Sequence, residues 1–317
     1  MAIPRLFGPR ANNRVKPKTL RGYIVAYNLF ITYLQLVGAP VITTVAYLDR
    51  WLTEYAEEGA RNRSEFSQAF AAVQFFHPNA KQHMPLSYQY KRGWDMSAPI
   101  RHTVPLVWFL LWGTVQALVA KNLIFSALGL LVQFGGYLRS VELLELTTDD
   151  IILPEFQKHS QEKQGCFLLL GMRTHGTKAR REQVAEVHDP WIIAALRFTY
   201  RNTAPGQKLF NMTYPQYAAN LQSAWADMGL DDIGLGTHSS RAGAAVRDLL
   251  NNVPFESVRE RGRWLHDQSC RIYLDRAQAL ALATQARSLK YQHYALNPQR
   301  IGNIFAFLPV TPKPSLK

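Results

Sequence analysis

The fold of this chain is decided by three short segments, Gly-Thr-His-Ser-Ser-Arg (236–241), Gly-Arg-Trp (262–264) and Cys-Arg-Ile-Tyr (270–273). They contain an imidazole in His238, a guanidinium in Arg241, an indole in Trp264 and a phenol in Tyr273. Trp264 follows Arg241 by 23 positions, and Tyr273 follows Trp264 by nine. A guanidinium stays charged at any working pH, and its planar fork of donors matches two oxygens of a phosphate. The pattern therefore indicates chemistry at an anionic phosphodiester, with tyrosine as the attacking group.

The three segments resemble the active-site half of the tyrosine recombinases, the phage-integrase family. In that family a His-x-x-Arg pair opens one helix, a His or Trp follows a glycine after a second helix, and the nucleophilic tyrosine lies nine residues further on. The resemblance implies that Tyr273 is the nucleophile and that Arg241 clamps the phosphate. It implies that His238 assists proton transfer or donates to a phosphate oxygen. Trp264 stands where histidine is commoner, and is expected to pack or to donate its indole N–H.

A second arginine is expected upstream, because a phosphodiester repels nucleophiles until its non-bridging oxygens are neutralised. Residues 135–146 read Gly-Gly-Tyr-Leu-Arg-Ser-Val-Glu-Leu-Leu-Glu-Leu. They resemble the family's first-arginine motif, Gly-x-Arg-x-x-Glu-Leu, which implies that Arg139 is the first phosphate clamp. On a helix Arg139 and Glu142 lie on one face, so Glu142 is predicted to orient the guanidinium.

The resemblance also implies a lysine in a β-hairpin between these motifs, acting as general acid. Residues 165–172 and 181–187 have the pattern of two short strands, and residues 174–178 read as the turn between them. Lys178, in a Gly-Thr-Lys turn, is the predicted acid. Lys163 remains the alternative.

The charge of the chain fits a polyanionic partner. There are 36 Lys+Arg against 23 Asp+Glu, a formal net charge of +13. An acid-free basic run opens the chain, which predicts an arm that lies on DNA: Arg5, Arg10, Arg14, Lys16, Lys18 and Arg21.

The chain is long enough for two domains, and the expected fold is mainly α-helical with a small antiparallel β-hairpin. We predict a basic arm over 1–16, a helical DNA-binding domain over 17–100, a catalytic domain over 101–296 and an extension over 297–317. Aromatic side chains at helical spacing predict four helices in the first domain and are interpreted as its core. This arrangement resembles the family's SAM-like core-binding domain ahead of its catalytic domain.

Two apolar stretches, 104–120 and 123–138, favour a rival interpretation as a membrane hairpin. The first has 17 residues without a charge, the lower limit for a span. Buried helices of a large domain are also apolar all round. Because Arg139 and Glu142 follow directly, in register with the active-site motif, we expect buried helices and no membrane partner.

The resemblance implies a site-specific recombinase that cleaves and rejoins double-stranded DNA through a 3′-phosphotyrosine, working as a homo-tetramer on paired sites. The altered neighbours of Arg241 point to a divergent branch carried by a mobile element. A type IB topoisomerase and a non-catalytic DNA-binding relative remain as alternatives. The sequence has no Walker-type stretch and no Cys/His cluster at metal spacing, so no cofactor or metal is predicted. Two cysteines and the absence of an N-terminal secretory signal predict a reducing compartment, cytoplasmic or nuclear.

Overall fold

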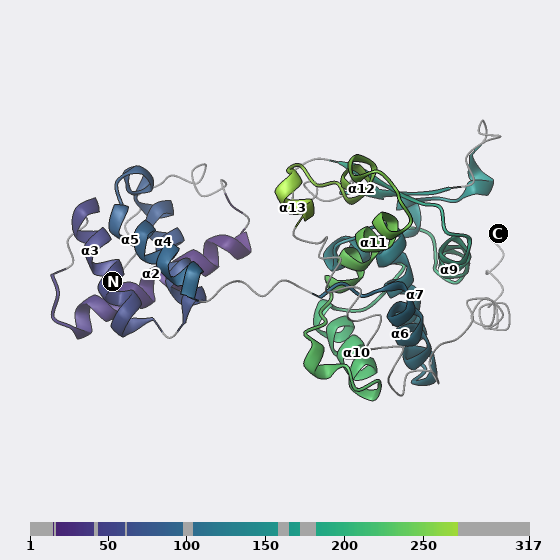
Figure 1. The fold of residues 1–317 in the computed structure, drawn as a ribbon, viewed down its shortest axis with the longest axis horizontal. Coiled ribbons are helices and arrows are strands. Elements are labelled where there is room, and N and C mark those ends of the chain that lie inside the picture. Colours follow the sequence, from purple (N-terminus) through teal and green to yellow (C-terminus); the bar gives the residue numbers. More distant parts are fainter. Residues whose placement is uncertain are drawn as a thin grey trace. The chain divides into compact units, whose positions relative to one another are not determined.

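The computed structural model of the 317-residue chain describes residues 15, 17–40, 44–60, 62–97, 104–157, 165–171 and 182–271. The chain divides into two compact units, Met1–Arg101 and His102–Lys317 (Figure 1). The described residues are mainly helical, with one small antiparallel sheet, so the predicted fold class is confirmed. The predicted C-terminal extension, and the predicted basic arm apart from Val15, lie outside the described residues.

The first unit contains the four helices expected from its aromatic pattern: α2 (Pro17–Leu36), α3 (Val45–Glu54), α4 (Arg63–Phe76) and α5 (Pro85–Ser97). A π-helical turn, Tyr55–Gly59, extends α3, and a 3₁₀ turn, Pro78–Gln82, precedes α5. The aromatic stripes are core, since Phe30 and Phe66 are fully buried. Asp49 of α3 caps α5 by accepting the backbone N–H groups of Leu86 and Ser87, at 3.0 and 2.8 Å.

The second unit is built on its own core and carries the motif residues. Its helices are α6 (Trp108–Ala120), α7 (Ile124–Gly135), α8 (Ser140–Glu145), α9 (Pro190–Arg201), α10 (Tyr214–Asp227), α11 (Ser239–Leu250), α12 (Phe255–Gly262) and α13 (Asp267–Arg271). Short 3₁₀ turns lie at Thr148–Asp150, Pro154–Phe156 and Asp231–Ile233.

The sheet of the second unit has the strand order β1-β2-β3, all antiparallel: β1 (Ile151–Ile152), β2 (Cys166–Leu170) and β3 (Gln183–Val187). β2 and β3 lie inside the two stretches predicted as strands, with Cys166 opposite Val187. β1 was not predicted, because two residues are too few to show a period.

The apolar stretches form α6 and α7, joined by a tight turn. Asn122 there adopts a left-handed conformation (φ 60°), which asparagine tolerates better than most residues. Both helices are buried nearly all round because α6 packs on α7, α10 and α11, while α7 also packs on α9 (Figure 1). Among the described residues no helix is long and apolar enough to cross a bilayer. The packing and burial of α6 and α7 agree with the expectation of buried helices.

The segment before α6 lies directly against the start of α11. The backbone N–H of Leu106 donates to the carbonyl of Ser239 at 2.8 Å. A Cβ at Gly243 would lie 1.8 Å from the Leu106 carbonyl oxygen. The glycine therefore permits a backbone contact that holds the helix carrying Arg241.

We expect Gly243→Ala to destabilise the second unit by about 3 kcal/mol, at the upper end for overpacking, because backbone rather than a flexible side chain must move. Gly236→Ala is the matched control, since a Cβ there meets no atom within 4 Å. Urea unfolding followed by tryptophan fluorescence measures both. Equal stability of Gly243→Ala and the wild type would contradict the close contact.

Candidate active site

The first part of the site is the turn between α7 and α8. Arg139 occupies the N-cap position of α8 with extended backbone angles, so it precedes the helix rather than lying within it as predicted. Its backbone N–H donates to Glu142 Oε2 at 2.8 Å, and its guanidinium Nη1 pairs with Glu142 Oε1. The expected contact between Arg139 and Glu142 is present, and the carboxylate binds both ends of the arginine.

The turn itself depends on an unusual residue, Tyr137. A Gly-x-Arg motif would place glycine two residues before Arg139, whereas this chain has tyrosine there in a left-handed conformation (φ 52°). This conformation costs an L-residue about 1–2 kcal/mol. Buried contacts offset that cost: the Tyr137 hydroxyl donates to Asp248 Oδ2 at 2.7 Å, and the ring packs edge-on against Trp264.

The second part of the site is Arg241 on α11, which is only 2% exposed. Its Nη1 donates to the carbonyl of Tyr137 at 2.6 Å, and its Nη2 donates to the carbonyl of Gly262. The guanidinium lies 4.8 Å from the centre of the Trp264 ring. Arg241 thus joins the Arg139 turn to the segment that follows α12.

That third segment contributes Trp264 and an arginine that the sequence pattern did not assign. Arg263 is left-handed (φ 57°), and its Nη2 donates to Glu142 Oε2 at 2.9 Å and to the Tyr137 carbonyl at 3.1 Å. Trp264 is 9% exposed, and a Cβ at Gly262 would lie 1.7 Å from its ring. The one signal for Arg263 was its position between the two motif residues of Gly-Arg-Trp.

The electrostatics of the site centre on Glu142. It contacts Arg139 and Arg263, and Arg241 Nη1 lies 3.9 Å from its Oε2. Burial opposes ionisation, but Arg263, the Arg139 backbone N–H and the two other guanidinium groups outweigh it and hold the pKa of Glu142 below its usual range. Three guanidinium groups contact the one carboxylate of Glu142. The other acceptors described above for Arg241 and Arg263 are backbone carbonyls, which carry no charge. Such a cluster suits an anion.

The remaining predicted residues differ in what the structure describes. His238 lies at the N-cap position of α11, three residues before Arg241, and is exposed. Tyr273, Lys178 and the alternative Lys163 lie outside the described residues. The described chain reaches Arg271 at the end of α13, two positions before Tyr273.

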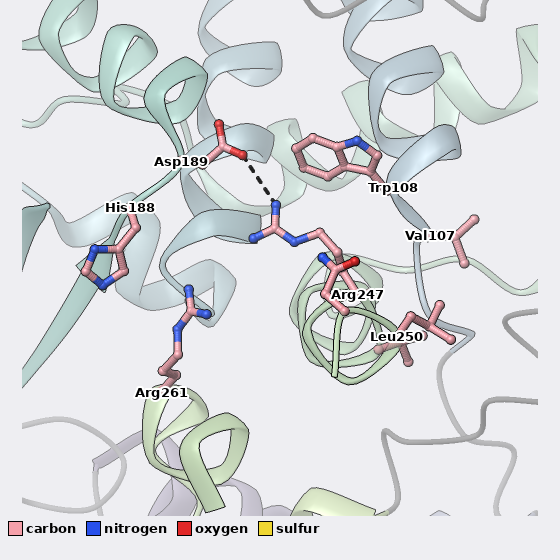
Figure 2. Close-up of a pocket in the computed structure, with 10 residues that line it drawn as sticks. Val107, Trp108, His188, Asp189, Arg247, Leu250 and Arg261 are labelled. Carbon is pink, nitrogen blue, oxygen red and sulfur yellow. Dashed lines mark hydrogen bonds and ion pairs between the residues drawn. The ribbon is translucent and has the colours of Figure 1, made fainter. Parts of the chain in front are cut away.

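A network of hydrogen bonds and ion pairs connects Tyr137 of the site to Asp248 and to neighbouring arginines. Asp248, which accepts the Tyr137 hydroxyl, also pairs with Arg261 and Arg247, and Arg247 reaches Asp189 at 3.5 Å. Figure 2 shows this last pair beside a pocket of about 620 Å³, which Arg261 also lines. Burial and then Asp248 raise the pKa of the Tyr137 phenol, so this tyrosine stays protonated and engaged. Among the described residues, no group of three or more His, Cys, Asp or Glu is placed to hold a metal ion.

No family model matches the sequence, and no curated protein matches it. Solved structures are similar over most of the chain. XerH site-specific recombinase, bound to its palindromic difH substrate, aligns with a TM-score of 0.61 at 15% identity, over 85% of this chain and 80% of that one. A lambda integrase dimer bound to a COC' core site gives 0.58 at 13%, over 84% and 92%. The Tn1549 transposon integrase, in complex with a circular intermediate DNA, gives 0.56 at 12%, over 88% and 98%.

At 12–15% identity, structural similarity shows the fold alone, and this fold is the one that the motifs implied. This chain has the fold of the tyrosine recombinases and integrases.

Proposed function

We propose that this protein is a site-specific DNA recombinase that cleaves and rejoins DNA through a 3′-phosphotyrosine intermediate. One observation carries the proposal: Arg139 and Arg241, from segments far apart in the sequence, both contact Glu142, and Trp264 packs against the Arg241 guanidinium. The motifs predicted these residues as one site from chemistry and spacing. Their contacts gather guanidinium groups around one carboxylate, with Arg241 buried and Arg139 partly exposed, an arrangement that suits a backbone phosphate.

In the proposed reaction one phosphate ester bond is exchanged for another, so the number of ester bonds does not change. The Tyr273 oxygen attacks the scissile phosphorus, a new P–O bond forms, and the bond to the 5′-oxygen breaks. Lys178 gives a proton to the leaving 5′-oxygen, and His238 helps to remove the proton of the phenol. Arg139 and Arg241 neutralise charge on the non-bridging oxygens. Because the phosphotyrosine keeps the free energy of the phosphodiester, a 5′-hydroxyl reseals it without a nucleotide or a metal.

Two of three tyrosines near the candidate site are buried and hydrogen-bonded, which favours Tyr273 as the nucleophile, and the third is a testable alternative. Tyr137 is buried and hydrogen-bonded to Asp248. Tyr217 is fully buried and donates to Gln133 at 2.7 Å. The exposed phenol of Tyr214 contacts Thr237, next to His238, at 3.1 Å. Tyr214 is therefore the sharpest control for the assignment of the nucleophile.

The partners follow from the same proposal. Double-stranded DNA is the substrate. The basic run over 1–16 and the helical unit that precedes the catalytic unit in the sequence add contacts to its phosphates. Four copies of the protein act together on two paired sites. We place the enzyme in the cytoplasm of a prokaryote or the nucleus of a eukaryote, where the DNA is. The likeness to integrases agrees with a role in a mobile element.

The test traps the covalent intermediate. DNA selected from a random pool for binding is nicked a short distance 3′ of the scissile phosphate, so that the short released fragment, which carries the 5′-hydroxyl, diffuses away. We expect a protein–DNA band on a denaturing gel that Tyr273→Phe abolishes and Tyr214→Phe retains. Loss of the band in Tyr214→Phe instead would reassign the nucleophile.

Two further outcomes would overturn the proposal. Binding without any adduct would mark a non-catalytic DNA-binding relative. An adduct formed by monomers that relax supercoils, with no recombinant product, would mark a topoisomerase.

A further inference from the structure

Gln133 is a fully buried polar residue in the apolar helix α7. Its amide nitrogen donates to the carbonyl of Thr237 at 2.7 Å, to the carbonyl of Leu138 at 3.2 Å and to the hydroxyl of Ser140 at 3.2 Å. Its amide oxygen accepts the hydroxyl of Tyr217 at 2.7 Å. Every polar atom of this buried side chain is therefore hydrogen-bonded.

The partners of Gln133 flank two residues of the candidate site. Leu138 and Ser140 stand on either side of Arg139, and Thr237 directly precedes His238. The bond to Thr237 joins positions 104 apart in the sequence. One amide thus connects the turn that carries Arg139 to the start of the helix that carries Arg241.

The orientation of the amide is fixed by its partners. The carbonyls of Thr237 and Leu138 only accept hydrogen bonds, so the amide nitrogen must face them. Its oxygen then faces Tyr217, which donates from α10. Because a buried amide gives little net stability over an apolar side chain of the same shape, its distinctive contribution here is geometric.

We propose that Gln133 is a positioning residue that sets the spacing between Arg139 and the His238–Arg241 segment. The inference rests on the proposed recombinase function, and Gln133 itself does not touch the substrate. Losing the amide leaves DNA binding in place, since the phosphate-binding side chains remain. It slows cleavage, because transition-state stabilisation depends on the relative placement of the two arginines.

Gln133→Met removes the donors while keeping an unbranched side chain of similar size. We expect single-turnover cleavage at saturating DNA to fall about 10- to 100-fold, as for small misplacements of catalytic groups. DNA affinity should change less than about threefold, because no phosphate contact is lost. Gln116→Met is the matched control. Gln116 lies on the apolar helix α6, its amide oxygen has no partner among the described residues, and cleavage should be unchanged.

Gln133→Glu gives a pH-dependent readout that a merely structural role would not produce. The neutral carboxyl donates one hydrogen bond to the carbonyls, whereas the ionised carboxylate faces them and is repelled. Burial raises the pKa of such a carboxyl well above its usual value of about 4.3. Among the described hydrogen-bond partners of Gln133, Tyr217 is the titratable side chain, and burial raises the pKa of its phenol, so it stays neutral. The rate of cleavage by Gln133→Glu, divided by the wild-type rate, should fall at least about tenfold as pH rises from about 6 to 9. The reason is that the protonated fraction of a carboxyl falls about tenfold for each pH unit above its pKa.

The outcomes separate this inference from the function on which it rests. If the wild type forms no adduct, the recombinase proposal fails, and the positioning role falls with it. If the wild type forms the adduct and Gln133→Met cleaves normally, only the positioning role is overturned. A Gln133→Glu:wild-type ratio that is constant with pH overturns it too, and so does an equal loss in Gln116→Met. Should Gln133→Met not fold, the pH profile of Gln133→Glu decides alone.

Discussion

Replacing Arg241 with alanine is expected to lower the rate of DNA cleavage on the order of 10²- to 10³-fold, the usual loss for one preorganised donor to an oxyanion. Arg241 is the most buried of the three clustered arginines, at 2% exposed. Its two nitrogens already hold the carbonyls of Tyr137 and Gly262. The guanidinium is thereby fixed before substrate arrives, so little reorganisation accompanies binding.

The same contacts make Arg241→Ala destabilising, so the rate must be measured on folded protein at saturating DNA. The Gly262 carbonyl loses its side-chain donor, at about 1–3 kcal/mol if nothing replaces it, whereas the Tyr137 carbonyl keeps the hydrogen bond from Arg263. Arg241→Lys keeps the charge but loses the planar fork, and we expect a smaller yet clear loss of rate. Arg197→Ala is the control for the change in net charge, since Arg197 pairs with Glu155 outside the site. Cleavage by Arg241→Ala at a rate near that of Arg197→Ala would contradict the assignment.

The parts of the site that the sequence predicted are those whose chemistry is carried by side-chain type and spacing. Arg139 and Arg241 were predicted to lie close together because a phosphodiester needs several fixed donors, and both contact Glu142, while Trp264 packs against Arg241. Glu142 was predicted as the partner of Arg139 from helical spacing, and the contact exists although Arg139 precedes the helix. Residues only three positions apart can reach each other from the N-cap position as well as from within the helix, so the contact was predicted correctly although the position of Arg139 was not.

The parts that the sequence did not predict depend on backbone partners. Arg263 and Arg241 both donate to the Tyr137 carbonyl, and Gln133 donates to the carbonyls of Leu138 and Thr237. Every residue has a carbonyl, so sequence alone cannot indicate which one a distant side chain will reach. The left-handed backbone conformation of Tyr137 could not be predicted for a related reason, because Asp248, the partner that stabilises it, is 111 positions away.

The apolar helices illustrate a third limit. A run such as 104–120 shows that its residues avoid water, but not whether protein or lipid surrounds them. The packing of α6 against α10 and α11 supplies that answer. Gln133 was an interruption of the apolar pattern in the sequence, and in the fold it is a fully hydrogen-bonded crosslink.

Glu142→Gln is expected to destabilise the second unit by about 3 kcal/mol at neutral pH, the lower end of the loss from breaking a buried ion pair. Glu142 is 9% exposed at its side chain and faces Arg139, Arg263 and Arg241. The substitution keeps one acceptor oxygen but brings an amide nitrogen among three guanidinium groups. Without the charge of this carboxylate, the repulsion among the three guanidinium groups is no longer offset by Glu142.

The pH dependence of this loss has a definite sign. The folded-state pKa of Glu142 lies below the unfolded value, so ionisation stabilises the fold above the unfolded pKa of about 4.3. That stability disappears as pH falls through the folded-state pKa. Glutamine does not titrate, so the stability difference between wild type and Glu142→Gln should be largest near pH 7 and should shrink on acidification below about pH 4.

Urea unfolding at a series of pH values, followed by tryptophan fluorescence, measures the difference. Glu155→Gln is the matched control, because hydrogen bonding from Arg197 lowers the pKa of Glu155 to about 2. Its side chain is 37% exposed, so solvent screens the pair and its removal should cost clearly less. Glu142 holds the backbone of Arg139 as well as its charge, so Glu142→Gln should also slow cleavage while net positive charge in the site rises. Tighter DNA binding together with slower cleavage would follow from that combination, whereas a stability difference that grows on acidification would contradict the assigned role of the carboxylate.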